Sequence, residues 1–83
     1  MSWVASHFET IRRFLESRKG IHFADGFAGI PNVFSVEKTP IGIRLDNCRV
    51  YGEAELDALM GIVVERVARH ERTLDNKWRK NTP

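Results

Sequence analysis

The stretch that decides the fold runs from Glu53 to Trp78 and reads EAELDALMGIVVERVARHERTLDNKW. Its apolar residues recur at alternating spacings of three and four residues, which is the pattern of one buried face of an amphipathic helix. The stripe comprises Leu56, Met60, Val63 and Val67, is widened by Leu59, Ile62 and Val64, and continues through His70 to Leu74. We therefore predict one long C-terminal helix, with Gly52 at its N-cap position.

Charge is divided along this helix. Its first half carries four acidic side chains and a charge of −4, whereas six basic side chains against two acidic ones give +4 to the part from Arg66 onward. A helix of about 25 residues is roughly 40 Å long, which exceeds the expected width of a globule of this size. We therefore expect its last turns to project, to fray or to meet a partner. An antiparallel homodimer would pair the acidic half of one copy with the basic half of another.

A second amphipathic pattern predicts an N-terminal helix from Trp3 to Lys19. Its apolar stripe comprises Val4, Phe8, Ile11 and Leu15, with Trp3 and Phe14 at the edges. Ser2 can cap the start of this helix, and Gly20 can end it in a positive φ conformation after the basic residues Arg18 and Lys19.

Between the helices the pattern changes to the alternation typical of strands. Residues 21–24 predict a short strand, and residues 25–31 predict a loop because two glycines and a proline interrupt them. Three further strands are predicted at residues 32–37, 41–45 and 48–51. Asp46 and Asn47 would form a two-residue hairpin turn that places Leu45 opposite Cys48 on the apolar face.

The predicted fold class is therefore α+β: an N-terminal helix, a three-stranded antiparallel meander with a short extra strand at 21–24, and a long C-terminal helix. Both helices would cover one side of the sheet, giving two layers in a single domain of residues 1–83, with 79–83 as a frayed tail. The predicted core comprises Phe8, Ile11, Leu15, Phe34, Val36, Ile43, Leu45, Val50, Leu56, Met60 and Val63.

Composition favours a soluble cytoplasmic protein. The chain has 83 residues and a formal net charge of +2, which is too small to indicate a nucleic-acid partner by itself. A single cysteine, Cys48, can form no internal disulfide, and we expect no secretory leader and no membrane-spanning segment. On the apolar face of a strand, Cys48 is expected to be a small core residue.

Catalytic and metal-binding motifs are absent from the sequence. It contains no Walker loop, no G-x-S-x-G, no H-E-x-x-H and no C-x-x-C, so we predict no cofactor and no metal. His7, His22 and His70 fall on different predicted elements. The most enzyme-like cluster is His22 with Asp25, a base and its orienting partner, but no nucleophile is near them. A small enzyme or nuclease centred on this pair is therefore the weakest alternative.

Two groups of basic residues favour a second alternative, nucleic-acid binding. They comprise Arg12, Arg13, Arg69, Arg72, Lys77 and Lys80. The predicted order of helix, three strands and helix resembles that of double-stranded-RNA-binding domains. That resemblance implies phosphate contacts from basic residues near the start of the last helix. Here the last helix begins with Glu53 and Glu55, and this acidic start departs from the family's pattern.

The function we expect is that of a small non-enzymatic module that binds a protein partner. Such a module would act as a regulator or inhibitor of the kind common among small bacterial and phage proteins. The segment from Phe23 to Pro31 is apolar for a loop, and the stripe of the last helix continues beyond the length that a small sheet can cover. The predicted partner-binding residues are Phe27, Ile30, Val67, His70, Leu74 and Trp78.

Overall fold

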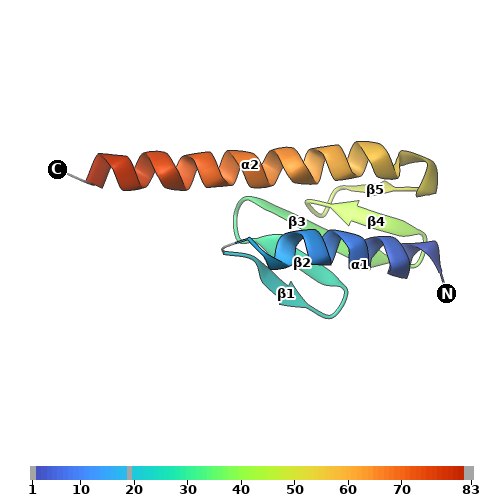
Figure 1. The fold of residues 1–83 in the computed structure, drawn as a ribbon. Coiled ribbons are helices and arrows are strands. Elements are labelled where there is room, and N and C mark those ends of the chain that lie inside the picture. Colours follow the sequence, from blue (N-terminus) through green and yellow to red (C-terminus); the bar gives the residue numbers. More distant parts are fainter. Residues whose placement is uncertain (1, 19, 82–83) are drawn as a thin grey trace.

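The structure, a computed structural model, describes residues 2–18 and 20–81, with side chains in the last helix described as far as Asn76. It has an α+β fold with one helix at each end of the chain and a sheet between them (Figure 1). The elements are α1 (Trp3–Glu16), β1 (His22–Ala24), β2 (Phe27–Ile30), β3 (Phe34–Thr39), β4 (Gly42–Leu45), β5 (Arg49–Tyr51), the 3-10 turn η1 (Glu53–Glu55) and α2 (Leu56–Asn81).

The five strands form an antiparallel sheet in which each strand pairs with its neighbour in sequence. The prediction of three strands and a short extra one is wrong by one strand, because β2 occupies the segment that was predicted to be a loop. Asp25 and Gly26 are the two-residue turn of a β1–β2 hairpin, with Gly26 at φ 71°. Pro31 lies in the next turn. Gly26 and Pro31 therefore flank β2, and Gly29 lies within the strand.

The turn between β4 and β5 lies at the predicted position, but it has three residues, 46–48, rather than the predicted two, and the faces of β5 were predicted wrongly. Asp46 and Asn47 have φ values of 55° and 61°. Leu45 pairs with Arg49 rather than with Cys48, which is exposed in the turn. Successive side chains of a strand point to opposite faces of the sheet. A shift of one residue therefore places each side chain of β5 on the face opposite to the predicted one. Tyr51 is consequently buried in the core, whereas Val50 is half-buried on the other face.

The buried side chains of the sheet share one face. Ala28 pairs with Val36, and Val36 pairs with Leu45, and residues directly opposite each other point to the same side. The core comprises Ala28, Ile30, Phe34, Val36, Ile43, Leu45 and Tyr51 from the sheet, Val4, Phe8, Ile11 and Leu15 from α1, and Leu59, Val63 and Val67 from α2. Most of the predicted core is confirmed, but Val50, Leu56 and Met60 are only half-buried.

The first helix is capped at its start as predicted. The backbone N–H of Ala5 donates to Ser2 Oγ at 3.2 Å. The helix ends at Glu16, a few residues before the predicted Lys19, and Gly20 follows with a φ of 80°.

The last helix outruns the core. Among the side chains of α2 that the structure describes, Val67 is the last that is buried, and Glu71 to Asn76 are exposed. Figure 1 shows α2 extending past the sheet at the end where β1 begins, and the longest dimension of the molecule is 52 Å. We call residues 71–81 the overhang. The last turns of α2 were expected to project, to fray or to meet a partner, and the structure shows that they project.

Candidate functional site

The sheet face opposite the core is lined by two rows of side chains. One row crosses all five strands and comprises Ala24, Phe27, Glu37, Arg44 and Val50. Within it, Arg44 and Glu37 form an ion pair of 2.7 Å, and the hydrogen bond from the guanidinium to Glu37 raises the pKa of Arg44. The second row is His22, Gly29 and Ser35. This face thus carries the Phe27 ring on β2 and the ion pair of Glu37 and Arg44 on β3 and β4.

A hollow of about 520 Å³ lies over the second row. It is lined by His22, Phe27, Gly29, Ile30, Pro31, Asn32, Val33, Phe34, Ser35, Asp46 and Asn47. Gly29, between His22 and Ser35, is buried beneath it. A Cβ at Gly29 would lie 2.5 Å from the carbonyl oxygen of Phe34, so the fold itself excludes a larger residue there.

Two tight turns form the end wall of the hollow. In the β2–β3 turn the N–H of Val33 donates to the carbonyl oxygen of Ile30 at 3.0 Å, and Asn32 has a φ of 63°. Pro31 before a residue of positive φ suits a type II turn. The β4–β5 turn contributes Asp46 and Asn47, both also at positive φ. Asn and Asp tolerate this conformation better than most residues, which explains why their polar side chains surround the hollow.

Arg66 of α2 joins these two turns. Its guanidinium is 3.0 Å from Asp46 Oδ2 and donates to the carbonyl oxygen of Val33 at 3.2 Å. The other carboxylate oxygen of Asp46 accepts the N–H of Ser35 at 3.1 Å. The charge of Asp46 is therefore balanced by Arg66. The same contact fixes α2 against the rim of the hollow.

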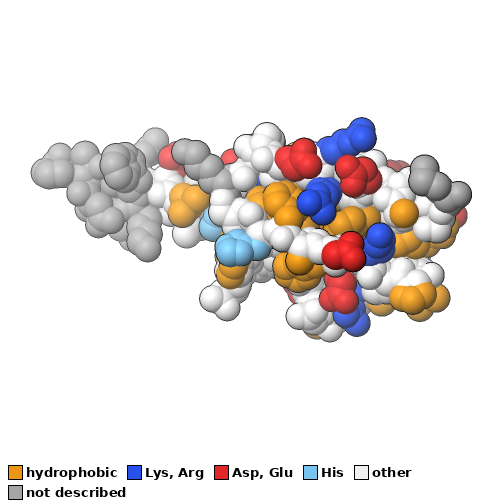
Figure 2. Space-filling model, turned by 90° about the horizontal axis from the view of Figure 1, so that it is seen from below, with side chains coloured by type: hydrophobic (Ala, Val, Ile, Leu, Met, Phe, Trp, Pro, Cys, Tyr) orange, Lys and Arg blue, Asp and Glu red, His pale blue; other side chains and the backbone are white. Residues whose placement is uncertain are grey.

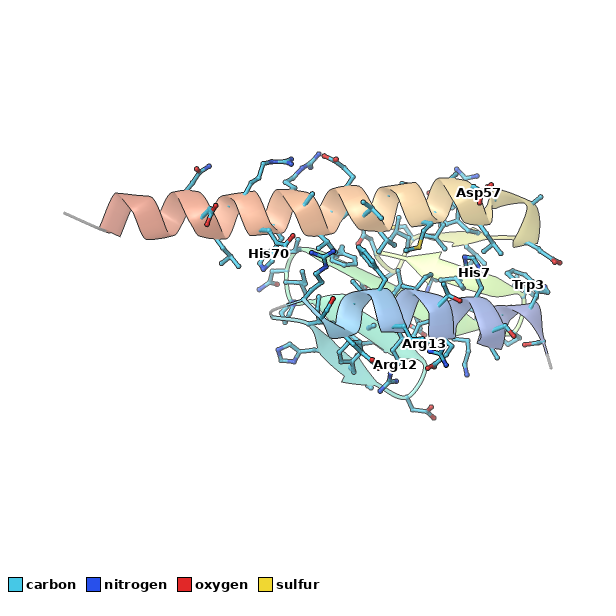
Figure 3. All side chains as sticks on the ribbon, viewed as in Figure 1. Trp3, His7, Arg12, Arg13, Asp57 and His70 are labelled. Atoms are coloured by element: carbon cyan, nitrogen blue, oxygen red, sulfur yellow. The ribbon has the colours of Figure 1, made fainter. Side chains whose placement is uncertain are left out.

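The overhang begins five residues after Arg66, beside the turn that follows α1. His70, one turn after Arg66, lies against the turn that follows α1, since a Cβ on Gly20 would be 3.6 Å from His70 Nε2. Figure 3 shows His70 on the side of α2 that faces the rest of the protein. Arg18 and Glu71 form an ion pair of 3.4 Å beside it. Leu74, one turn further on, is 44% exposed.

The structure separates the six predicted partner-binding residues. Phe27 lines the hollow and is half-buried, and Ile30 reaches its lining from the core. Val67 is 2% exposed and is part of the core, so its side chain offers no surface to a partner. His70 immediately precedes the overhang, and Leu74 is in its first turn. The side chain of Trp78 lies outside the described residues.

In the part of the chain that the structure describes, the predicted nucleic-acid-binding residues do not lie together on one surface. Figure 3 shows Arg12 and Arg13 on the side of α1 that points away from α2. Arg12 lies over the Phe23 ring at 5.0 Å, and Arg13 pairs with Glu9 at 3.6 Å.

On α2, both Arg69 and Arg72 lie beside Glu65, at 3.6 and 3.7 Å. Figure 2 shows acidic and basic side chains interspersed on the face seen from below. Lys77 and Lys80 lie outside the described side chains. The five-stranded sheet also departs from the three-stranded order on which the resemblance to double-stranded-RNA-binding domains rested.

His22 and Asp25 are separated by the length of β1. His22 begins the strand and Asp25 follows its end, so their Cα atoms are about 10 Å apart at the strand's rise per residue. Both residues are exposed, and no hydrogen bond or ion pair in the described part of the chain joins them. Within residues 2–18 and 20–81, no three His, Cys, Asp or Glu side chains are grouped so that they could hold a metal ion.

Sequence reasoning missed the hollow and its anchor, Arg66. Two signals were present: Pro31-Asn32 and Asp46-Asn47 are both turn-forming pairs, and an antiparallel meander brings alternate turns to the same end of the sheet. The glycine within β2 was a third signal. These signals could be combined into one site only if β2 was recognised as a strand.

Comparisons with protein-family models, with curated proteins and with solved structures found no match to this chain. Over the described residues, neither helix combines the length and the apolar character needed to cross a membrane.

Proposed function

We propose that this chain is a non-catalytic module that binds a protein partner and acts on it as a regulator or inhibitor. The observation that carries the proposal is the hollow on the sheet face opposite the core, whose end wall is joined to α2 by Arg66, five residues before the overhang. Contact with a partner at this end of the molecule would bury both features together.

Exposed apolar groups around the hollow support a protein as the partner. Val33 is 39% exposed at the rim, Phe27 is half-buried in the wall, and Leu74 is exposed on the overhang. Polar side chains, chiefly Asn32 and Asn47, surround them. A protein interface has the same composition, an apolar centre within a polar rim.

The pairing of charges supports a protein over a nucleic acid. The described cations of the two basic groups each lie next to a carboxylate or an aromatic ring. A phosphate backbone is bound by cations that acids do not neutralise. A non-catalytic role is supported by the separation of His22, at the start of β1, from Asp25, in the turn after it.

Affinity capture from a native extract, repeated after nuclease treatment, tests this function. The informative variant is Val33→Asp, which places a charge at the rim of the hollow. The matched control is Ile41→Asp, because Ile41 is 76% exposed in the turn at the opposite end of β3. Circular dichroism would verify that both variants fold.

We expect one protein to be captured by the wild type and by Ile41→Asp, to be lost with Val33→Asp, and to survive nuclease. Recovery of nucleic acid instead would favour the nucleic-acid alternative. Equal capture by both variants would show that the hollow is not the binding site.

A further inference from the structure

We infer that the free edge of β1 pairs with the same edge of a second copy of this chain, so that two sheets continue into one across a twofold axis. This inference goes beyond the proposed function, because it concerns the edge of the sheet rather than the hollow. It is carried by three properties of β1: its outward backbone groups, its lack of residues that block strand addition, and two opposite charges beside its central residue.

The backbone of Phe23 faces the free edge of the sheet. Hydrogen bonds of an antiparallel ladder alternate from one side of a strand to the other. The N–H of Lys38 donates to the carbonyl oxygen of Gly26 at 2.7 Å, so Gly26 bonds toward β3 and the next residue, Phe27, bonds toward β1. Phe27 pairs with Ala24, and the N–H and C=O of Phe23 therefore point away from β2. Since β1 is the last strand of the sheet, no strand of the described chain receives them.

Of the two edges of the sheet, β1 is the one open to strand addition. All three of its residues are exposed, whereas β5 is exposed only at Arg49 and buried at its last residue. Figure 1 shows α2 running alongside β5, while β1 lies at the side of the sheet farthest from α2. Edge strands are commonly protected by a charged residue or a proline. Arg49 fulfils this role on β5, but β1 contains no Arg, Lys or proline.

The sequence of β1 is complementary to itself in an antiparallel pair centred on Phe23. Phe23 of each copy would exchange two backbone hydrogen bonds with Phe23 of the other, and the two rings would be directly opposite each other on one face. On the other face, His22 of each copy would lie opposite Ala24 of the other, so a large side chain meets a small one. Because α1 packs chiefly over β3 and β4, it leaves this edge open to approach.

The charges beside β1 favour the same pairing. Arg12 lies over the Phe23 ring at 5.0 Å, and Asp25 is exposed in the turn that follows β1. Over the described residues, neither of these two charges forms an ion pair. In the antiparallel register, Asp25 of one copy is diagonal to Phe23 of the other, about 7–8 Å away. It is thereby placed beside the Arg12 that lies over that ring, once on each side of the twofold axis.

The chain itself thus supplies the acidic residue that any other strand would need in order to match this edge. A twofold axis perpendicular to the sheet would also leave both hollows on the same side of the dimer. His22 lines the hollow, and Ala24 of the second copy would lie next to it, so each copy would contribute to the edge of the other's hollow. A partner that carries two binding segments would then engage both hollows at once, which raises its apparent affinity.

Charge reversal tests this interface in the full-length chain. Arg12→Glu would place an acid beside Asp25 of the second copy, and Asp25→Arg would place a base beside Arg12, so each variant alone repels itself. When the two variants are mixed, each chain supplies the charge that the other lacks. Arg69→Glu is the matched control, because Arg69 is on α2 and undergoes the same change of charge. Sedimentation equilibrium over a range of concentrations measures the association, and circular dichroism verifies folding.

We expect a weak dimer, because the paired strands are short. The wild type and Arg69→Glu should approach twice the monomer mass as the concentration rises. Arg12→Glu and Asp25→Arg should each associate roughly 5- to 100-fold more weakly, since two symmetry-related contacts change from attraction to repulsion. An equimolar mixture of these two variants should recover the association as a heterodimer. Hydrogen exchange of the Phe23 amide should slow with concentration in the wild type, a measurement that depends on no variant.

A wild type that stays monomeric at the highest soluble concentration would overturn the inference, as would a dimer in which the Phe23 amide stays unprotected. Failure of the mixture to restore the association would overturn the charge pairing. A dimer lost with Arg69→Glu and retained with Arg12→Glu would place the interface on α2 and overturn the edge. Protection of Phe23 only when a captured protein is added would show that the edge receives a partner's strand instead. None of these results alters the proposed function, which is tested by capture with Val33→Asp.

Discussion

Truncating two leucines of the same helix would test where α2 leaves the core. Leu59 is fully buried at 0% exposure, whereas Leu74, four turns later, is 44% exposed. Changing leucine to alanine removes three carbons, which is worth about 2.4 kcal/mol of transfer free energy at roughly 0.8 kcal/mol per carbon. The cavity that remains in a packed interior raises the cost for Leu59→Ala to about 2–5 kcal/mol.

That loss is a large share of the stability of a domain of 83 residues, for which the free energy of unfolding is about 4–12 kcal/mol. Leu74→Ala should change it by less than about 0.5 kcal/mol, since the side chain is solvated and alanine is the better helix former. The assay is urea unfolding followed by circular dichroism, with the slope compared between variants to confirm that the same surface is exposed.

A cost below about 1 kcal/mol for Leu59→Ala would show that the buried face of α2 is wrongly assigned. A large cost for Leu74→Ala that grows with protein concentration would show instead that the overhang is buried between two copies. The homodimer through α2 would then be supported, since Val67 is already in the core and Leu74 is the exposed apolar residue of its stripe. Light scattering of Leu74→Glu beside the wild type would measure the same association directly.

Two further pairs of residues can be tested by substitution. Gly29→Ala should destabilise the sheet or prevent folding, because the new Cβ would lie 2.5 Å from the carbonyl oxygen of Phe34. Gly61→Ala should instead stabilise α2 by about 0.5–1 kcal/mol, because nothing lies within 4 Å of the new methyl group. Thermal melts of the two variants would check this, and similar shifts would contradict it. A double-mutant cycle on Arg66 and Asp46 should give a coupling of about 0.2–1 kcal/mol that falls with added salt, and a salt-independent coupling would refute an ionic contact.

Local patterns in the sequence were sufficient to predict both helices. The stripe of α1 and the cap at Ser2 involve residues at most four positions apart, so neighbouring side chains determine them without reference to the rest of the fold. The position of the Asp46-Asn47 turn was predicted in the same way, although the turn has three residues rather than two. These predictions are confirmed because the deciding interactions lie within one or two turns of chain.

The pairing of the strands and their register could not be predicted from local sequence patterns. Alternation in a strand has a period of two, so a shift of one residue at Cys48 fits the local pattern equally well and reverses both faces. The β2 segment was misread because its glycine and the flanking turn residues suggest a loop until strands on both sides pair with it. Only pairing across the sheet separates these alternatives.

The sequence by itself determined that this chain has two amphipathic helices, alternating strands between them and a last helix too long for a small core, because each property is a periodicity within one segment. The tertiary structure alone decided where that helix leaves the core and what its first exposed turn lies against. The contact of Arg66 with Val33 joins residues 33 positions apart, and the hollow forms where β1, β2, β3 and two turns meet. No local pattern encodes such a convergence, since it depends on the order and register of every strand between.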